Sequence, residues 1–185
     1  MNEVHSTLNG VKVKLVAFDS THVVDRVRWM NDHEFRQNLN TPYPVSERST
    51  HRWLDRLIGN PAQIDLIICE SSCDKPIGYT GFRGIDLANQ KAESYIGIGE
   101  PSYRGGGFAR EATFLALRYL FDRYPVNMVY ALVRVENNAA IRLHHALGYR
   151  TDGVLRDYLY SHGRFRNIAY LSLLREDFFS EGMAD

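Results

Sequence analysis

Hydrophobic residues repeat at two different spacings along the chain, and the change between them predicts where helices and strands lie. From residue 11 to residue 18 the chain is apolar and β-branched, which favours a strand. Residues 19–21 offer helix N-caps, and the apolar positions that follow have helical spacing: Val23, Val24, Val27 and Met30. Prolines at 42 and 44 end this helix, and Ser46 begins a second helix that stops at Gly59.

The middle of the chain has the spacing of strands, and the second half alternates strands with helices. Short runs at 63–70, 77–86 and 91–99 are separated by polar turns, which predicts an antiparallel meander. Helical faces at 108–124 and 138–147 then alternate with strand-like runs at 128–135, 148–158 and 167–174. This order is typical of crossover units, and it predicts an α/β (α+β) fold with a mixed sheet and helices on both faces.

Length and composition place the chain among globular proteins. Its 185 residues are 44% hydrophobic and 24% charged, so we expect a single domain over 1–185. Lys and Arg together number 22, as do Asp and Glu, and this balance argues against a nucleic-acid partner. No apolar run approaches the ~20 residues of a membrane helix, and the first ten residues lack a signal-peptide pattern. We therefore expect a cytoplasmic protein that has no membrane partner.

The segment with the clearest chemical content is the glycine-rich turn between residues 96 and 112. A strand ends there, the glycines Gly105, Gly106 and Gly107 follow, and a long helix begins. The first N–H groups of a helix have no intrahelical partner, and the helix dipole adds about half a positive charge. Glycines lack the β-carbons that would keep an anion away, and Arg104 and Arg110 add positive charge. The turn therefore predicts a phosphate or diphosphate site.

Two common phosphate-binding motifs do not fit this turn. No Gly-Lys-Ser/Thr follows it, so it is not a Walker loop. A dinucleotide fingerprint follows the first strand of a parallel unit, whereas three antiparallel strands come first here. Taken alone, the turn also fits a flexible connection before a helix that binds nothing.

Two motifs in fixed order resemble those of the GNAT (GCN5-related N-acetyltransferase) family. The run from Arg104 to Ala109 resembles its diphosphate-binding signature, Arg/Gln-x-x-Gly-x-Gly/Ala. Further along, Asn137 opens a helix that ends in Leu-Gly-Tyr149, which resembles the second signature. Segments 29–32, 92–98 and 136–174 look most like the branch of ribosomal-protein N-terminal, spermidine and amino-sugar acetyltransferases. The likeness covers a core of about 11–178, and it implies a mostly antiparallel sheet of about seven strands with a splayed central pair.

The resemblance also implies where acetyl-CoA binds. The diphosphate is expected on Arg104, Gly105, Gly106, Gly107, Phe108 and Ala109, and the pantetheine arm along the backbone of Gly97, Ile98 and Gly99. Two glycines in one strand end also permit the splay itself. Asn137 matches a residue whose amide contacts the pantetheine, although a plain helix N-cap is the alternative and one Asn could do both. No metal is expected.

Direct acetyl transfer needs groups that move protons. An alkylamine is mostly protonated at neutral pH, so a base must take its proton before attack. Glu93 is the first candidate base, although a solvated strand end explains it equally well; Asp157 and His162 are alternatives. The oxyanion needs a backbone N–H, which the strand near Ile98 could supply.

The leaving thiolate needs an acid, and here the chain departs from the family. The family usually has a Tyr seven residues after the Asn, and this chain has His144 there. Water or Tyr149 could serve instead, and an exposed helix histidine without a role is the other interpretation.

These features predict an acetyl-CoA-dependent N-acetyltransferase that acts on a primary amine by direct attack. The acceptor is expected to be a protein N-terminus, a polyamine, an amino sugar or a similar small amine. Its pocket is expected at 29–44 and 158–165, with an aromatic wall and acidic groups from Trp29, Asp32, Glu34, Tyr43, Asp157, Tyr158 and Tyr160. A non-catalytic acyl-CoA-binding or sensor domain and a nucleotide-binding module are the alternatives. The partner of the enzyme is expected to be a small-molecule or peptide amine, and a homodimer is left open.

Overall fold

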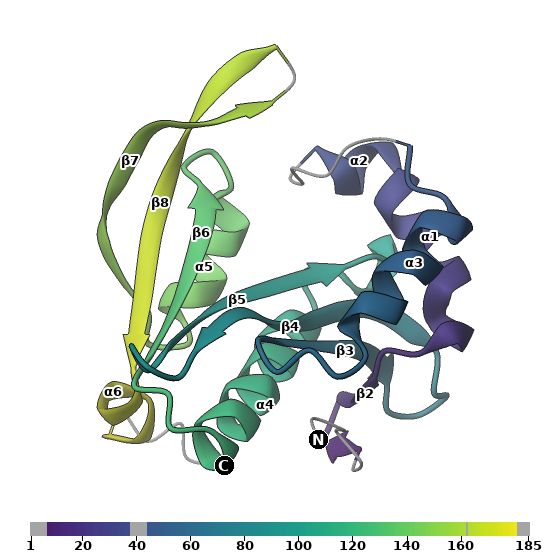
Figure 1. Cartoon of the computed structure of the whole chain (residues 1–185), viewed down its shortest axis with the longest axis horizontal. Coiled ribbons are helices and arrows are strands. Elements are labelled where there is room, and N and C mark those ends of the chain that lie inside the picture. Colours follow the sequence, from purple (N-terminus) through teal and green to yellow (C-terminus); the bar gives the residue numbers. More distant parts are fainter. Residues whose placement is uncertain (1–6, 38–43, 162, 181–185) are drawn as a thin grey trace.

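The computed structural model describes residues 7–37, 44–161 and 163–180, and its centre is one eight-stranded sheet (Figure 1). The strand order is β1-β2-β3-β4-β5-β6-β8-β7. All neighbouring strands are antiparallel except β5 and β6, which are parallel. The predicted mixed, mostly antiparallel sheet is therefore confirmed. The strand beyond the expected seven is β1 (Leu8–Asn9), whose two residues are too short to show a hydrophobic period.

The strands follow the predicted runs closely in the middle of the chain. Their bounds are β2 Val13–Ala17, β3 Gln63–Glu70, β4 Pro76–Asp86, β5 Lys91–Ile98 and β6 Met128–Arg134. The closing hairpin is longer than predicted, because β7 is Arg150–Ser161 and β8 is Arg164–Leu174. Most β7 side chains are exposed, so no buried period marks its end in the sequence.

Four of the eight helical segments that the structure describes begin with a capping side chain. Asp19 caps a short 3-10 turn (Ser20–His22), which leads into α1 (Val23–Asn31). Asp32 caps α2 (His33–Arg36), Ser46 caps α3 (Glu47–Leu57) and Asn137 caps α5 (Asn138–His145). The others are a 3-10 turn (Pro101–Tyr103), α4 (Phe108–Arg123) and α6 (Arg175–Ser180). None of the helices that the structure describes has the length and apolar content to cross a membrane.

Two hydrophobic clusters cover the two faces of the sheet. Leu66 belongs to the cluster beneath α4, with α5 and α6 also contributing to it. Its neighbour Ile67 belongs to the cluster beneath α1, α2 and α3. Alternate residues of a strand point to opposite faces, so one apolar run serves both layers. Helices on both faces of the sheet, as predicted, are confirmed.

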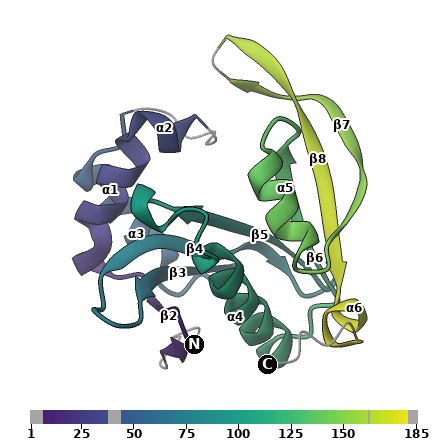
Figure 2. The same cartoon turned by 180° about the vertical axis from the view of Figure 1, so that it is seen from behind.

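β5 and β6 are paired only at their first residues. The register joins Lys91 to Met128, Ala92 to Val129 and Glu93 to Tyr130, and no later pair appears in the described residues. Beyond this point β5 continues toward α1 and α2, whereas β6 stays beside β8 and α5 (Figures 1 and 2). The predicted splay of the central pair is present, and it begins after Glu93.

Candidate active site

A cleft of about 1210 Å³ occupies the space where the sheet splays. Its lining comes from α1 to α3, β3 to β5, the turn after β5, the start of α4, β6 and α5. It brings together most of the predicted site residues: Glu93, Gly97, Ile98, Arg104, Gly105, Gly107, Ala109, Asn137 and His144. The predicted residues Gly99, Gly106 and Phe108 lie beside the cleft and are not part of its lining.

The start of α4 has the properties of an anion-binding site. Gly105 and Gly107 have φ angles of +80° and +84°, in the left-handed region that favours glycine. No side chain in the described residues caps α4, whereas side chains cap α2, α3 and α5. The first N–H groups of this 16-residue helix are therefore available to a ligand.

Lys12 lies beside this turn and was not predicted as a site residue. Its Nζ donates a hydrogen bond to the carbonyl oxygen of Gly106 (2.8 Å) and lies 5.8 Å from the centroid of the Phe108 ring. A β-carbon on Gly107 would come within 3.4 Å of the same nitrogen. Glu111, in the first turn of α4, accepts a hydrogen bond from the backbone N–H of Lys12 (3.0 Å) and so fixes its position.

Arg104 ties the turn to the end of β5. Its Nε donates to the carbonyl oxygen of Ile98 (3.2 Å) and its Nη2 to that of Gly99 (3.4 Å). Its Nη1 lies 3.4 Å from Oε2 of Glu34 on α2. The side chain is 34% exposed and lines the cleft, so it can meet an anion on the turn.

The glycines at the end of β5 make room for aromatic rings. A β-carbon on Gly99 would lie 2.2 Å from Cγ of Trp29, and one on Gly97 would lie 2.6 Å from Cζ of Phe35. α1 and α2 therefore pack against this face of the strand. The contact with pantetheine remains a prediction. We expect it along the edge of β5 that faces β6, because this edge is unpaired after Glu93.

Asn137 uses one half of its amide as a helix cap. Its Oδ1 accepts a hydrogen bond from the backbone N–H of Ala140 (3.1 Å). Its Nδ2 has no partner in the described residues, and the residue lines the cleft. Capping α5 thus leaves the donor half of the amide for a ligand, as the sequence allowed.

His144 is 3% exposed, so the interpretation as an exposed helix residue is wrong. Its Nδ1 lies 2.8 Å from the carbonyl oxygen of Ala140, which can only accept, so Nδ1 carries the proton. Its Nε2 is buried without a partner in the described residues. Burial lowers the pKa of His144, against the bond to Ala140, which raises it. The imidazole is therefore neutral at rest, with a bare Nε2.

Tyr149, the alternative acid, is buried against His144. The two rings meet edge-on with centroids 4.9 Å apart. The Tyr149 hydroxyl lies 3.0 Å from Oγ of Ser94, and Ser94 lines the cleft whereas Tyr149 does not. Burial raises the pKa of Tyr149 far above its usual value, so this phenol keeps its proton.

Glu93 lies at the fork where β5 and β6 part, opposite Tyr130 of β6. Its side chain is only 13% exposed, so the interpretation as a solvated strand end is wrong. Its Oε1 lies 2.5 Å from Nη2 of Arg83, directly across the β4–β5 pair. A partly buried carboxylate at the fork can accept a proton, directly or through water.

The end of the cleft beneath α1 and α3 is lined by aromatic rings, and we call it the aromatic end. Its residues are Arg26, Phe35, Trp53, Arg56, Asp65, Tyr79, Arg83, Glu93 and Tyr95. Burial raises the pKa of Asp65, against hydrogen bonds from Tyr95 and Gln63 and the charges of Arg26 and Arg83. Arg26 and Asp65 were not predicted as site residues. Each is a charged residue among apolar neighbours in the sequence, and that pattern could have indicated them.

Most of the predicted acceptor residues lie elsewhere. Trp29 is a core residue, 1% exposed, whose Nε1 donates to Glu100 (2.9 Å). Asp32 caps α2, and Tyr158 and Tyr160 are exposed on β7 outside the cleft lining, as is Asp157. Glu34 lines the cleft. Tyr43 and His162 lie outside the described residues.

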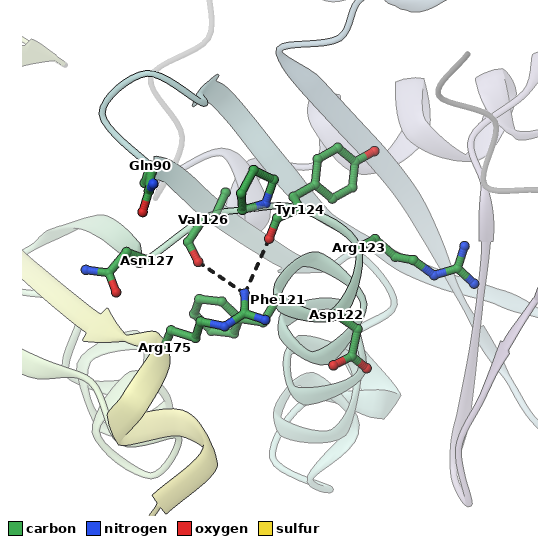
Figure 3. Close-up of a pocket in the computed structure, with 9 residues that line it drawn as sticks. Gln90, Phe121, Asp122, Arg123, Tyr124, Val126, Asn127 and Arg175 are labelled. Carbon is green, nitrogen blue, oxygen red and sulfur yellow. Dashed lines mark hydrogen bonds between the residues drawn. The ribbon is translucent and has the colours of Figure 1, made fainter.

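A second, smaller hollow of about 470 Å³ lies at the other ends of β5 and β6 (Figure 3). Nη1 of Arg175 donates there to the carbonyl oxygens of Tyr124 (3.3 Å) and Val126 (3.4 Å), and its guanidinium lies 5.9 Å from the Phe121 ring. These contacts hold the α4–β6 connection against α6, so Arg175 stabilises the fold at this place.

Comparisons with known proteins agree with this arrangement. The family model of the acetyltransferase (GNAT) domain matches residues 12–150. The uncharacterized N-acetyltransferase p20 of Bacillus licheniformis is 34% identical over 157 residues, 82% of this chain and 86% of that protein. Spermidine N(1)-acetyltransferase of Escherichia coli (strain K12) is 30% identical over 97 residues, 52% of each chain.

The fold is shared with a solved structure. The spermidine N-acetyltransferase of Vibrio cholerae, crystallised with CoA and spermine, superposes with a TM-score of 0.84 at 22% identity, covering 90% of this chain and 98% of that one. Since the family model also spans more than half of the sequence, the chain belongs to the GNAT acetyltransferase family.

Proposed function

We propose that this GNAT enzyme, an acetyl-CoA-dependent N-acetyltransferase, acetylates a primary amine in the cleft between β5 and β6. The observation that carries this is the parting of the two strands after Glu93, with the uncapped start of α4 at one end and a partly buried carboxylate at the fork. The site has both a place for an anionic carrier and a place for a proton acceptor.

The residues at the turn fit the diphosphate of acetyl-CoA. The N–H groups that begin α4 follow the glycines at 105–107, Arg104 and Arg110 line the cleft at this turn, and Nζ of Lys12 donates to the carbonyl oxygen of Gly106. Nδ2 of Asn137 and the unpaired edge of β5 near Ile98 offer donors and acceptors to the pantetheine arm.

The chain's own groups then manage charge and protons. Acetyl-CoA supplies an activated thioester carbonyl, and an N–H at the free edge near Ile98 would stabilise the negative charge that forms on its oxygen. Glu93 would accept the proton that the amine must lose. His144 is neutral at rest, so it would first take a proton from water before it protonates the leaving sulfur, and Glu93 would return the proton of the amine to water. The bare Nε2 of His144 is the place where the proton for the sulfur would be held.

The acceptors named for the relatives share one chemical group with the acceptor proposed here. Relatives of this chain include spermidine N-acetyltransferases and a putative ribosomal N-acetyltransferase of Bacillus subtilis. A polyamine, a protein N-terminus and an amino sugar share a primary amine, and we propose an acceptor with this group.

The test is thiol release from acetyl-CoA in the presence of primary amines, with mass spectrometry of the acetylated product. We expect release that depends on an amine. Arg104→Gln should raise the KM for acetyl-CoA about ten-fold, because it removes a charge-assisted contact. Arg118→Gln, on an exposed part of α4, is the matched control. Tight acetyl-CoA binding without thiol release with any amine would instead indicate a sensor domain.

A further inference from the structure

We propose that the acceptor amine also carries an anionic group, a carboxylate or a phosphate, and that Arg26 binds this group at the aromatic end of the cleft. The proposal rests on the proposed function and specifies the acceptor of the same site. It is carried by the contacts of Arg26, by the pairing of the carboxylates around it, and by the occupation of the aromatic rings.

Arg26 makes no hydrogen bond or ion pair in the described residues, although its charge acts on the nearby Asp65 carboxylate. Its guanidinium carbon lies 4.1 Å from the centroid of the Trp53 ring and 4.7 Å from that of Tyr79. It lines the cleft, and its Nη1 is buried with no hydrogen-bond partner in the described residues. A buried guanidinium N–H without an acceptor is unfavourable, and a carboxylate or phosphate oxygen is the acceptor that it binds most strongly.

Two of the three carboxylates that line the cleft in the described ranges are paired with other cations. Glu93 pairs with Arg83 (2.5 Å) and Glu34 pairs with Arg104 (3.4 Å). Asp65 acts on Arg26 through its charge, but no hydrogen bond or ion pair joins the two in the described residues, and its Oδ2 accepts a hydrogen bond from Nε2 of Gln63 (2.7 Å).

Glu34, Asp65 and Glu93 are the carboxylates that line the cleft among the described residues. Arg56 of α3 lines the same end and has no anionic partner in the described residues. The aromatic end therefore has more positive than negative charge, and a ligand with its own anion would restore the balance.

The aromatic rings do not offer a site for a second cation. Trp and Tyr faces bind ammonium groups through cation–π contacts, but Arg26 already covers the faces of Trp53 and Tyr79. A polyamine would bring two or more ammonium groups to an end where Glu93 and Glu34 are already paired with arginines and where Asp65 is only 8% exposed. We therefore expect spermidine to be a poor acceptor for this enzyme.

The experiment compares acceptors in matched pairs that differ only in the anion. Glucosamine 6-phosphate against glucosamine tests phosphate, and a dipeptide against its C-terminal amide tests carboxylate, with spermidine as the polycation. Thiol release from acetyl-CoA gives kcat/KM for each. In at least one pair we expect the anionic member to exceed the neutral one about ten-fold or more, and to exceed spermidine. The pair that shows this identifies the anion.

Arg26→Met keeps the apolar stem of the side chain and removes its charge. The ratio of kcat/KM within the preferred pair should then fall toward one, while Arg118→Met should leave the ratio unchanged. Arg26→Lys, which keeps the charge but loses the planar fork, should give an intermediate ratio even if the Met variant fails to fold.

The possible failures are separable. Spermidine or the neutral amines outperforming every anionic partner would overturn the inference while acetyl transfer stands. An anion preference that survives in Arg26→Met would overturn the assignment to Arg26. No thiol release with any amine would overturn the proposed function, and the inference with it.

Discussion

Gly107 provides the most direct test of the anion site at the start of α4. Its φ of +84° lies where a β-carbon is strained, so Gly107→Ala costs about 1–2 kcal/mol in the backbone alone. For a domain of this size that corresponds to a fall in Tm of about 2–8 °C. The new β-carbon would also lie 3.4 Å from Nζ of Lys12, at the place where we expect the diphosphate. We therefore expect the affinity for CoA to fall about ten-fold or more as well.

Gly59 is the matched control for the backbone strain. Its φ is +76°, and a β-carbon there would meet nothing within 4 Å. Gly59→Ala should therefore lose a similar amount of stability and bind CoA as the wild type does. Thermal unfolding measures the first effect and isothermal titration with CoA the second. If Gly107→Ala bound CoA normally, or if Gly59→Ala weakened binding equally, the anion site would not be at this turn.

Four further predictions concern three buried or partly buried titratable groups. Because His144 is held neutral, its stabilising contribution is complete above an unfolded pKa of about 6.5 and is lost as pH falls through the lower folded pKa. Urea unfolding from pH 8 to pH 5 should therefore show a smaller acid loss in His144→Asn than in wild type, with the exposed His145→Asn as control. His144→Ala should lower the turnover number more than it lowers the affinity for CoA. If the variant turned over as fast as the wild type from pH 6 to pH 9, His144 would not be the acid. Asp65 has a raised pKa, so its contribution is complete below about pH 3.9 and is lost as pH rises; Asp65→Asn should gain stability relative to wild type between pH 4 and pH 8, unlike the exposed Asp55→Asn. Glu93→Gln should lower kcat and leave KM for acetyl-CoA unchanged, and equal effects on both would argue against a role in proton transfer.

Local patterns were sufficient to predict most of the fold. β3 has the predicted bounds, Gln63–Glu70, because a buried strand between two turns has an unambiguous pattern. Ser46 and Asn137 cap the helices that they were expected to begin, because the capping bond is formed within four residues. The glycine-rich turn at 105–107 belongs to the same class, since its glycines and the helix α4 are adjacent in the sequence.

Contacts between distant segments could not be predicted in the same way. Lys12 reaches Gly106 across 94 positions, and its neighbours do not distinguish it from other lysines. Trp29 was expected to line the acceptor pocket, but it fills the space left by Gly99, which depends on how α1 packs on β5. Aromatic residues favour both cores and pockets, so composition alone could not separate Trp29 from Trp53.

The contact between Trp29 and the end of β5 limits how this enzyme can be recombined with its relatives. The indole packs where Gly99 has no side chain, and its Nε1 donates to Glu100, two residues after the end of β5. A chimera that exchanged α1 without the 97–100 segment would bring together an unmatched ring and strand. Exchange of both segments as one block should therefore preserve the contact between Trp29 and Gly99 and the bond to Glu100.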